Sequence, residues 1–307
     1  MLGHRNQVLH LNKALYLIRG NPIKLGSLLS SLAPGSVDFT AILNPPAGSH
    51  SWFSQVHHIP GDRSAHLTFL VPDQIQENDD LLTFIDFLCF QAGEMGALNL
   101  LADIEEYNPL FELLRRTGFC VFSWESIWQL PGLTGSAPSE ASWIKPSAQD
   151  EINIRSLYQT LIPPLVQNAE PFTNGNTPRL VYKVNNEIQA YVESYSGPAG
   201  IYLVPVIHPS VENIDALLRD LVSHFQGDGR AVYLQVRSYQ AWLTDMLHEF
   251  GAQPSPRFAL LVKHLAVTQL SPIKETQRVR AEGRQAEPTA PIVNQYLRKD
   301  SPSEEVK

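Results

Sequence analysis

Apolar residues recur with helical spacing in two well-separated stretches of the chain. The stripe in the second half follows the spacing i, i+3, i+4, i+7, i+8 and i+11, and consists of Ile214, Leu217, Leu218, Leu221, Val222 and Phe225. The stripe in the first half consists of Leu81, Leu82, Ile85, Leu88 and Cys89. Because a helix has about 3.6 residues per turn, this spacing puts each set on one face. The sequence therefore predicts an amphipathic helix at both places.

Short apolar runs on either side of these helices predict strands. In the first half the runs before the helix are "VDFTAIL", "SWFSQVHHI" and "HLTFLVP". In the second half "TPRLVYKVNNEIQAYVESY" reads as two strands joined at Asn185-Asn186, a pair that tolerates positive φ in a tight hairpin, and "IYLVPVI" follows. After each helix come a further strand ("ALNLLA" or "AVYLQV"), a second helix and a last strand.

The two halves repeat these elements in the same order. In "ELLRRTGFCVFSWESIW" a helix ends at Gly118, and in "DMLHEFGAQPSPRFALLVKHL" a helix ends at Gly251, 133 positions later. The segments "FLVP" and "YLVP", at Phe69 and Tyr202, are separated by the same distance. Several short matches in register indicate an internal duplication.

The composition between and after the two halves predicts the domain boundaries. The stretch "PGLTGSAPSEA" is rich in Pro, Gly and Ser and has no apolar periodicity, as is typical of a linker. The end of the chain is rich in charge, Gln and Pro, which is typical of disorder. We expect an N-terminal domain at 1–130, a linker at 131–141, a C-terminal domain at 142–268 and a disordered tail at 269–307. The expected fold class is α+β or mixed α/β, with a twisted mixed sheet and helices on both faces in each domain.

Charge and composition exclude several classes of protein. The net charge of −8 and the pI of about 5.7 argue against nucleic-acid binding, including a role for the arginines of the tail. No apolar run approaches the ~18 residues of a membrane span. The two cysteines, Cys89 and Cys120, have no disulfide or metal-ligand spacing, and no signal peptide is visible, so we expect a cytoplasmic protein with no metal site.

The order of elements resembles the GNAT (N-acetyltransferase) superfamily, and in particular bacterial proteins with two GNAT-like units. The stretch from Val232 to Leu265 resembles the family's fifth strand, fourth helix, helix-ending glycine and sixth strand, and Gly118-Phe119 matches the same helix ending. The resemblance implies that acetyl-CoA or another acyl-CoA is the cosubstrate. It also implies that the acceptor is an amine, on a small molecule or a peptide.

Two features of the family's site are missing from both halves. The glycines of the pyrophosphate-binding turn correspond to Gln76 and Asn78, or to Glu212 and Ile214. The tyrosine that often protonates the departing thiolate, four residues before the helix-ending glycine, corresponds to Leu114 and Leu247. The family often has an asparagine seven residues before this tyrosine position. The corresponding residues are Tyr107 and Gln240, so only the second half has a side-chain amide there.

The remaining candidates lie mainly in the second half. The candidate catalytic residues are Glu193, His208 and Tyr239. The candidate residues for holding the acyl-CoA arm, chiefly by backbone hydrogen bonds, are Leu203, Val204, Val206, Ile207 and Gln240. His58 and His66 lie on comparable strands of the first half, where a histidine with a pKa near 6.5 would suit proton removal from an ammonium.

Two functions stay open at the level of sequence. The first is an acyl-CoA-dependent N-acyltransferase whose C-terminal unit is active and whose N-terminal unit is a structural lid. The second is a catalytically silent tandem module that binds a small molecule or a protein. The sequence predicts no oligomeric state and no particular acceptor.

Overall fold

The computed structural model describes residues 8–20, 37–44, 51–73, 79–132, 142–172, 177–225 and 229–265. Residues Met1–Val267 form one compact unit. We call residues 8–132 the first half and residues 142–265 the second half. The predicted linker lies mostly outside the described residues, and the predicted tail lies wholly outside them.

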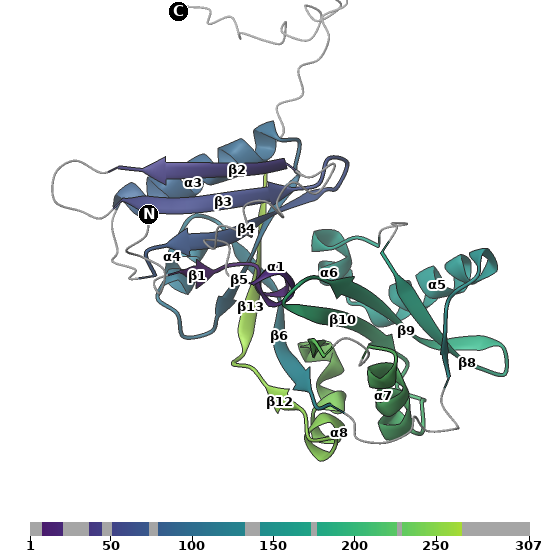
Figure 1. Cartoon of the computed structure of the whole chain (residues 1–307). Coiled ribbons are helices and arrows are strands. Elements are labelled where there is room, and N and C mark those ends of the chain that lie inside the picture. The colour runs from purple at the N-terminus through teal and green to yellow at the C-terminus, as the bar shows by residue number, and fades with distance from the viewer. Residues whose placement is uncertain are drawn as a thin grey trace, which may run out of the picture. The chain divides into compact units, whose positions relative to one another are not determined.

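The main strands and helices of each half follow one another in the order that the sequence predicts, with three consecutive strands before α3 and before α7 (Figure 1). The first half contains β1 (Leu9–His10), α1 (Lys13–Arg19), β2 (Val37–Leu43), β3 (Trp52–His58), β4 (Ser64–Val71), α3 (Asp79–Glu94), β5 (Asn99–Glu105), α4 (Leu110–Arg116) and β6 (Cys120–Leu130). The second half begins with β7 (Trp143–Ile144), the 3-10 turn η2 (Ala148–Asp150), α5 (Glu151–Leu161), α6 (Pro164–Ala169), β8 (Arg179–Val184), β9 (Glu187–Ser196) and β10 (Gly200–Ile207). It ends with α7 (Ile214–Ser223), β11 (Ala231–Arg237), the 3-10 helix η4 (Ser238–Leu243), α8 (Thr244–Glu249), β12 (Gln253–Pro254) and β13 (Phe258–His264).

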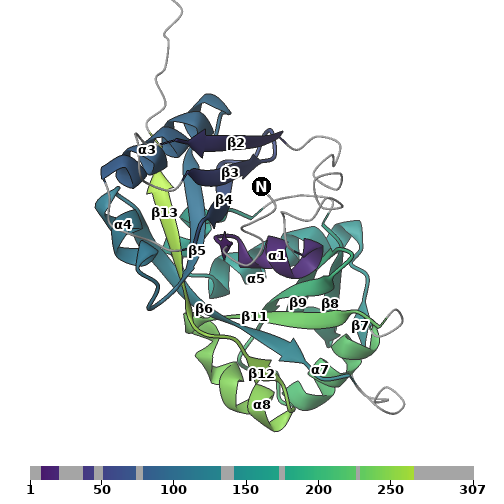
Figure 2. The same cartoon turned by 60° about the vertical axis from the view of Figure 1, so that its left-hand side comes forward.

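All the described strands belong to one mixed sheet, in which the two halves exchange their last long strands. The main strand order is β2-β3-β4-β5-β13-β6-β11-β10-β9-β8-β7. Strand β13 of the second half therefore lies between β5 and β6 of the first half, and β6 pairs with β11 of the second half (Figures 1 and 2). The expected mixed α/β fold class is confirmed, and the structure adds that the two sheets are joined. The domain division at 131–141 stays a prediction.

Helices cover both faces of the sheet, and each of α3 to α8 buries apolar residues. Helices α3 and α4 pack on one face of the first half, and the predicted stripe from Leu81 to Cys89 contributes to that core. Helices α7 and α8 pack on the corresponding face of the second half. Helices α5 and α6 cover the opposite face, where they contact strands of both halves.

The two glycines that end α4 and α8 adopt the conformation that the sequence predicts. Gly118 has φ 89° and Gly251 has φ 82°, the left-handed region that favours glycine. The amide of Phe119 donates to the carbonyl oxygen of Leu114 (3.1 Å), and the amide of Ala252 donates to that of Leu247 (2.9 Å). This is the bonding of a Schellman motif, which directs the chain from the helix into the next strand. The predicted hairpin is also confirmed, since Asn185-Asn186 joins β8 to β9 with both φ values positive.

Among the described residues, no helix is long and apolar enough to cross a membrane. Both cysteines are free, with Cys89 buried and Cys120 exposed.

Candidate functional site

Each half contains one pair of parallel strands that starts in register and then separates. Strands β4 and β5 pair only from Ser64 to His66. Strands β10 and β11 pair from Gly200 to Leu203. Beyond these residues the strands no longer pair, and we call the region between the carboxyl ends of each pair its cleft. Ligands of open α/β sheets commonly bind at such ends.

The cleft of the first half is filled by the N-terminal strand β1. Strand β1 pairs antiparallel with β4, with Leu9 opposite Leu70 and His10 opposite Phe69. Leu11 continues this contact, because its amide donates to the carbonyl oxygen of Thr68 (2.9 Å) and its own carbonyl oxygen accepts from the amide of Asp103 on β5 (2.8 Å). Leu11 is only 2% exposed. Strand β1 and Leu11 thus supply hydrogen-bond partners to the backbone of both β4 and β5 beyond the point where these strands separate.

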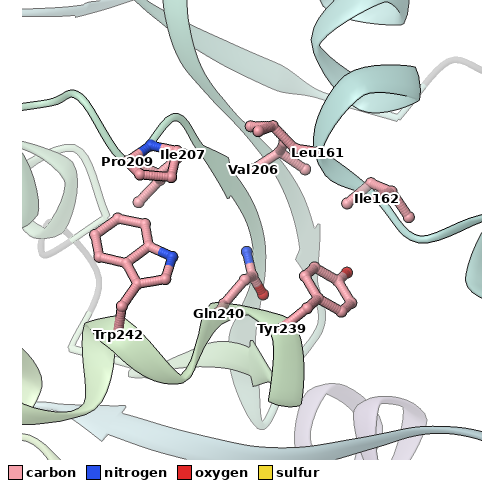
Figure 3. A pocket seen from close by; sticks show the side chains of 8 residues that line it. All are labelled: Leu161, Ile162, Val206, Ile207, Pro209, Tyr239, Gln240 and Trp242. Atoms are coloured by element: carbon pink, nitrogen blue, oxygen red, sulfur yellow. The ribbon is translucent and has the colours of Figure 1, made fainter.

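The cleft of the second half holds a small pocket of about 50 Å³. Two of its residues come from β10, three from η4, two from the end of α5, and one from the loop after β10 (Figure 3). They are Val206, Ile207, Tyr239, Gln240, Trp242, Leu161, Ile162 and Pro209. Ligand pockets commonly measure about 300–1,000 Å³, so this pocket would have to widen to hold an acyl-CoA arm.

Gln240 bridges the two diverging elements of this cleft. Its Nε2 donates to the carbonyl oxygen of Pro205 (2.7 Å), and its Oε1 accepts from the backbone amide of Arg237 (3.1 Å). Figure 3 shows the Gln240 side chain between Tyr239 and Trp242. Because the side chain is buried and both polar atoms have partners, Gln240 closes the cleft in this conformation.

Tyr239 lies in the pocket wall beside Gln240. Burial raises the pKa of its phenol to about 12, although the nearby Arg237 guanidinium opposes the rise. The phenol therefore keeps its proton at neutral pH.

Glu193 lies on β9, opposite Val204 where β10 begins to leave β11, but it does not line the pocket. Its Oε1 lies 2.8 Å from Nη2 of Arg179, and its Oε2 accepts from the hydroxyl of Tyr195 (3.0 Å). The carboxylate is thus held in an ion pair in this structure.

His208 follows β10 and also lies outside the pocket wall, although the next residue, Pro209, lines it. The Nδ1 atom of His208 accepts from the backbone amide of Ser210 (3.2 Å) and lies 2.6 Å from the Ser210 hydroxyl oxygen. In the neutral ring the proton consequently sits on Nε2. His208 could act as a base only after Ser210 releases Nδ1.

The other candidates divide between the pocket and the core. Val206 and Ile207 line the pocket as part of β10. The side chain of Leu203 is fully buried in the second-half core, and Val204 has no side chain in the pocket wall. The structure thus brings Val206, Ile207, Tyr239 and Gln240 together, and it leaves Leu203, Val204, Glu193 and His208 outside.

Sequence reasoning missed four residues of the pocket wall. Leu161 and Ile162 close it from the end of α5, and Pro209 and Trp242 complete it. Trp242 could have been found, since it lies two residues after the candidate Gln240. No local pattern connects the end of α5 with β10, so Leu161 and Ile162 could not have been found.

The N-terminus of α7 is capped by its own residues. Oδ1 of Asn213 accepts from the amide of Ala216 (3.0 Å). Asp215, in the first turn, forms an ion pair with Arg219 (2.7 Å). A pyrophosphate at this end would have to replace the Asn213 cap and approach Asp215. The corresponding positions of the first half, Gln76 and Asn78, lie outside the described residues.

A buried ionic network lies on the sheet face that carries Tyr239. Arg237 on β11 contacts Glu125 on β6 (Nε to Oε2, 3.3 Å) and Glu170 after α6 (Nη2 to Oε2, 2.8 Å). Gln235 Nε2 donates to Oε2 of the same Glu125 (2.6 Å). Nη1 of Arg237 is buried and has no hydrogen-bond partner among the described residues. Within the described part of the chain, no group of acidic, histidine or cysteine side chains has the arrangement of a metal site.

Comparison with known proteins gives matches in structure but not in sequence. No family model matches the chain, and no curated protein is similar enough in sequence to match. A conserved protein of unknown function from Staphylococcus epidermidis has a TM-score of 0.50 and 12% identity, over 69% of this chain and 91% of its own. A GCN5-related N-acetyltransferase from Sphaerobacter thermophilus has a TM-score of 0.49 and 14% identity, over 73% of this chain and 80% of its own.

A tandem GNAT protein from the clavulanic acid biosynthesis pathway is also similar, with a TM-score of 0.46 and 12% identity over 77% of this chain and 86% of its own. Structures of GNAT proteins, one of them tandem, are thus among those that this chain resembles. At these identities the similarity concerns the fold alone.

Proposed function

We propose that the protein is an acyl-CoA-dependent N-acyltransferase whose acyl donor binds in the cleft of the second half. One observation carries this proposal: β10 and β11 separate, and a pocket lined mostly by apolar side chains and Tyr239 lies between the end of β10 and η4, which follows β11, whereas β1 fills the equivalent cleft of the first half. The apolar wall suits an acyl chain and the arm of a thioester. The backbone of β10 supplies hydrogen-bonding groups along the cleft, as in strand addition.

In the proposed reaction the neutral nitrogen of an amine attacks the carbonyl carbon of the thioester. A carbon–nitrogen bond forms, the carbon–sulfur bond breaks, and the sulfur leaves with the electron pair. The Tyr239 phenol, still protonated at neutral pH, gives its proton to the departing thiolate. The proton lost by the amine returns the phenolate to its neutral form.

Donor binding in this cleft requires a local change at Gln240. The side chain must release the carbonyl oxygen of Pro205, which then becomes available to the arm of the donor. In the free protein, the Gln240 side chain thus holds β10 and the end of β11 together by its two hydrogen bonds.

Calorimetry with acetyl-CoA tests the proposal, with a variant that fills the pocket as the decisive arm. We expect wild-type protein to bind, and we expect Leu161→Trp, in the pocket wall, to lower the affinity at least 10-fold. Leu165→Trp is the matched control, because Leu165 is 55% exposed on α6 and does not line the pocket. If folded wild-type protein gives no heat at millimolar acetyl-CoA, the proposal is wrong.

A catalytically silent tandem module is the second candidate, and specific observations favour it. The N-terminus of α7 is already capped by Asn213, and the residue at the family's tyrosine position, Leu247, is fully buried. The test is acetyl transfer to a panel of peptide and polyamine amines, measured by the release of the CoA thiol. Transfer to any member of the panel would exclude this candidate.

A further inference from the structure

The N-terminal segment 8–20, which we call the strap, contacts both halves of the molecule. Its strand β1 lies in the first-half cleft, and its helix α1 packs against β10 of the second half. Figure 2 shows α1 lying over the strands of the second half, directly after β1. The strap therefore contacts one strand of each cleft, β4 in the first half and β10 in the second.

The first anchor of the strap is built from backbone hydrogen bonds and a buried carboxyl. Besides the two bonds of Leu11, the amide of Lys13 donates to Oδ2 of Asp103 (2.9 Å), at the start of α1. Asn12 caps the same helix by accepting from the amide of Leu15 (2.9 Å). The ammonium of Lys13 lies 4.9 Å from the ring centroid of Phe258, on the exchanged strand β13. These contacts, together with the burial of Leu11, hold the strand in the cleft of the first half.

The second anchor lies where β9 turns into β10. The carbonyl oxygen of Ile18 accepts from the amide of Ala199 (2.9 Å). A Cβ atom added to Gly197 would lie 2.2 Å from that same oxygen, and one added to Gly200 would lie 2.9 Å from the carbonyl oxygen of Leu17. Both glycines are therefore required by the close approach of α1.

Gly200 marks the closed end of the second-half cleft. It is the first residue of β10 that pairs with β11, opposite Ala231. The end of α1 thus contacts the start of the paired section of β10 and β11, three residues before Leu203, after which the two strands diverge toward the pocket.

We infer that the strap permanently occupies the first-half cleft and braces the closed end of the second-half cleft, so that each chain has a single donor site. The nature of the donor rests on the proposed function, but the placement of the strap does not. In this arrangement the first half contributes no chemistry, and its N-terminal segment is a positioning element for the site of the second half.

A disulfide across the first anchor tests whether the strap has to move. Leu9 and Leu70 are direct partners in an antiparallel pair, whose Cα separation of about 4.5–5.5 Å allows a disulfide. The double variant Leu9→Cys/Leu70→Cys, made with Cys120→Ser to remove the exposed thiol, is compared in its oxidised and reduced forms. We expect both forms to bind acetyl-CoA at one site per chain, with affinities within 3-fold. Loss of binding on oxidation, or two sites in the reduced form, would overturn the inference.

Substitution of a glycine tests the second anchor. Gly197→Ala forces the Ile18 carbonyl away, and we expect at least a 5-fold loss of acetyl-CoA affinity in a protein that stays folded. Gly132→Ala is the control, because a Cβ atom there meets nothing within 4 Å. Unchanged affinity in folded Gly197→Ala would contradict the bracing role.

Amide hydrogen exchange separates this inference from the proposed function. In wild-type protein we expect the amides of Leu11 and Asp103 to exchange only at the rate of global unfolding, whether or not acetyl-CoA binds. We expect the Ala199 amide to lose its protection in Gly197→Ala but not in Gly132→Ala. Fast exchange of Leu11 or Asp103 in the wild-type protein would overturn the inference even if the donor binds. If the donor does not bind but these amides are protected, only the proposed function fails.

Discussion

Arg237 shows how single residues hold the exchanged strands together. The Arg237 side chain is only 6% exposed. Its guanidinium supplies the positive charge opposite the Glu125 carboxylate, which lies on the neighbouring strand of the other half. Burial also raises the pKa of the nearby Asp103 carboxyl to about 8, with a further rise from the charge of Glu125. A buried charge is tolerated only while its partner is present, because its desolvation is otherwise uncompensated. The network therefore connects β11 to β6, and the loss of either Arg237 or Glu125 alone would leave the other charge buried without a partner.

Removal of Arg237 should strongly destabilise the fold. We expect Arg237→Met to lower the free energy of unfolding by about 3–5 kcal/mol, because Glu125 is left buried without a counter-charge. Arg219→Met is the control, since the pair of Arg219 with Asp215 is exposed and screened by solvent, so its loss should change stability little. Urea denaturation measures both values. Adding Glu125→Leu to Arg237→Met should recover part of the loss, and a further loss would contradict this explanation.

His66 should make stability depend on pH in the acid range. Burial lowers the pKa of its imidazole to about 4, whereas in the unfolded chain the pKa is near 6.5. The unfolded state therefore binds the proton first, so the contribution of His66 is complete above pH 6.5 and is lost as the pH falls toward 4.

The variant His66→Gln isolates this contribution. Denaturant midpoints at pH 7 and pH 5 should differ more in the wild-type protein than in His66→Gln, with the surface variant His248→Gln resembling the wild type. An equal drop in all three proteins would show that His66 does not carry the effect.

At the scale of elements, the N-terminus of α7 illustrates a helix start built for stability. Asn213 satisfies the amide of Ala216, which a phosphate-binding turn would leave to the ligand. Asp215 adds a negative charge near the positive end of the helix, and this charge is favourable for the helix but unfavourable for a pyrophosphate.

Loss of this cap should destabilise the protein without removing donor binding. We expect Asn213→Ala to lower the free energy of unfolding by about 0.5–2 kcal/mol. Acetyl-CoA affinity should be unchanged or rise, because the freed amides face the place where the pyrophosphate would lie. The comparison variant is Asn108→Ala, which removes the side-chain bond to the amide of Leu110 at the start of α4 in the first half. A loss of affinity confined to Asn213→Ala would show that Asn213 itself holds the donor.

Long elements could be predicted from the sequence because their patterns are local. The stripe from Ile214 to Phe225, the hairpin at Asn185-Asn186 and the glycine-ended helices depend on spacing and backbone preference alone. Strand partners could not be predicted. Strand β1 has two residues, too few for any pattern, and nothing in "FALLVKH" states that β13 pairs in the other half. Glu125 and Arg237 read as ordinary polar positions of strands, and only the exchange turns them into a buried pair.

At the scale of the whole molecule, the exchange of β6 and β13 makes each half incomplete without the other. Strand β13 lies between β5 and β6, so a separate first half would expose the edge of β5 along seven residues. Strand β6 likewise covers β11 over six residues. Long unpaired edges are sites of aggregation, so neither half has the edges of an independent domain.

The two halves should therefore fold only together. We expect fragments 1–141 and 142–267 to lack cooperative thermal unfolding when produced separately. When the two fragments are co-expressed, they should form a one-to-one complex whose circular dichroism spectrum matches that of the intact chain. Size-exclusion chromatography and circular dichroism measure this outcome, and a monomeric first fragment with a sharp unfolding transition would contradict it.

The exchange also bears on how such a protein can evolve. A half that has lost its own binding cleft is normally free to be deleted or to diverge without limit. Here the second half pairs with β6 and contacts α1, so a loss of the first half would also disturb the proposed donor site of the second. Selection on the proposed donor site would thus also preserve the first half, which contributes no residue to the pocket wall.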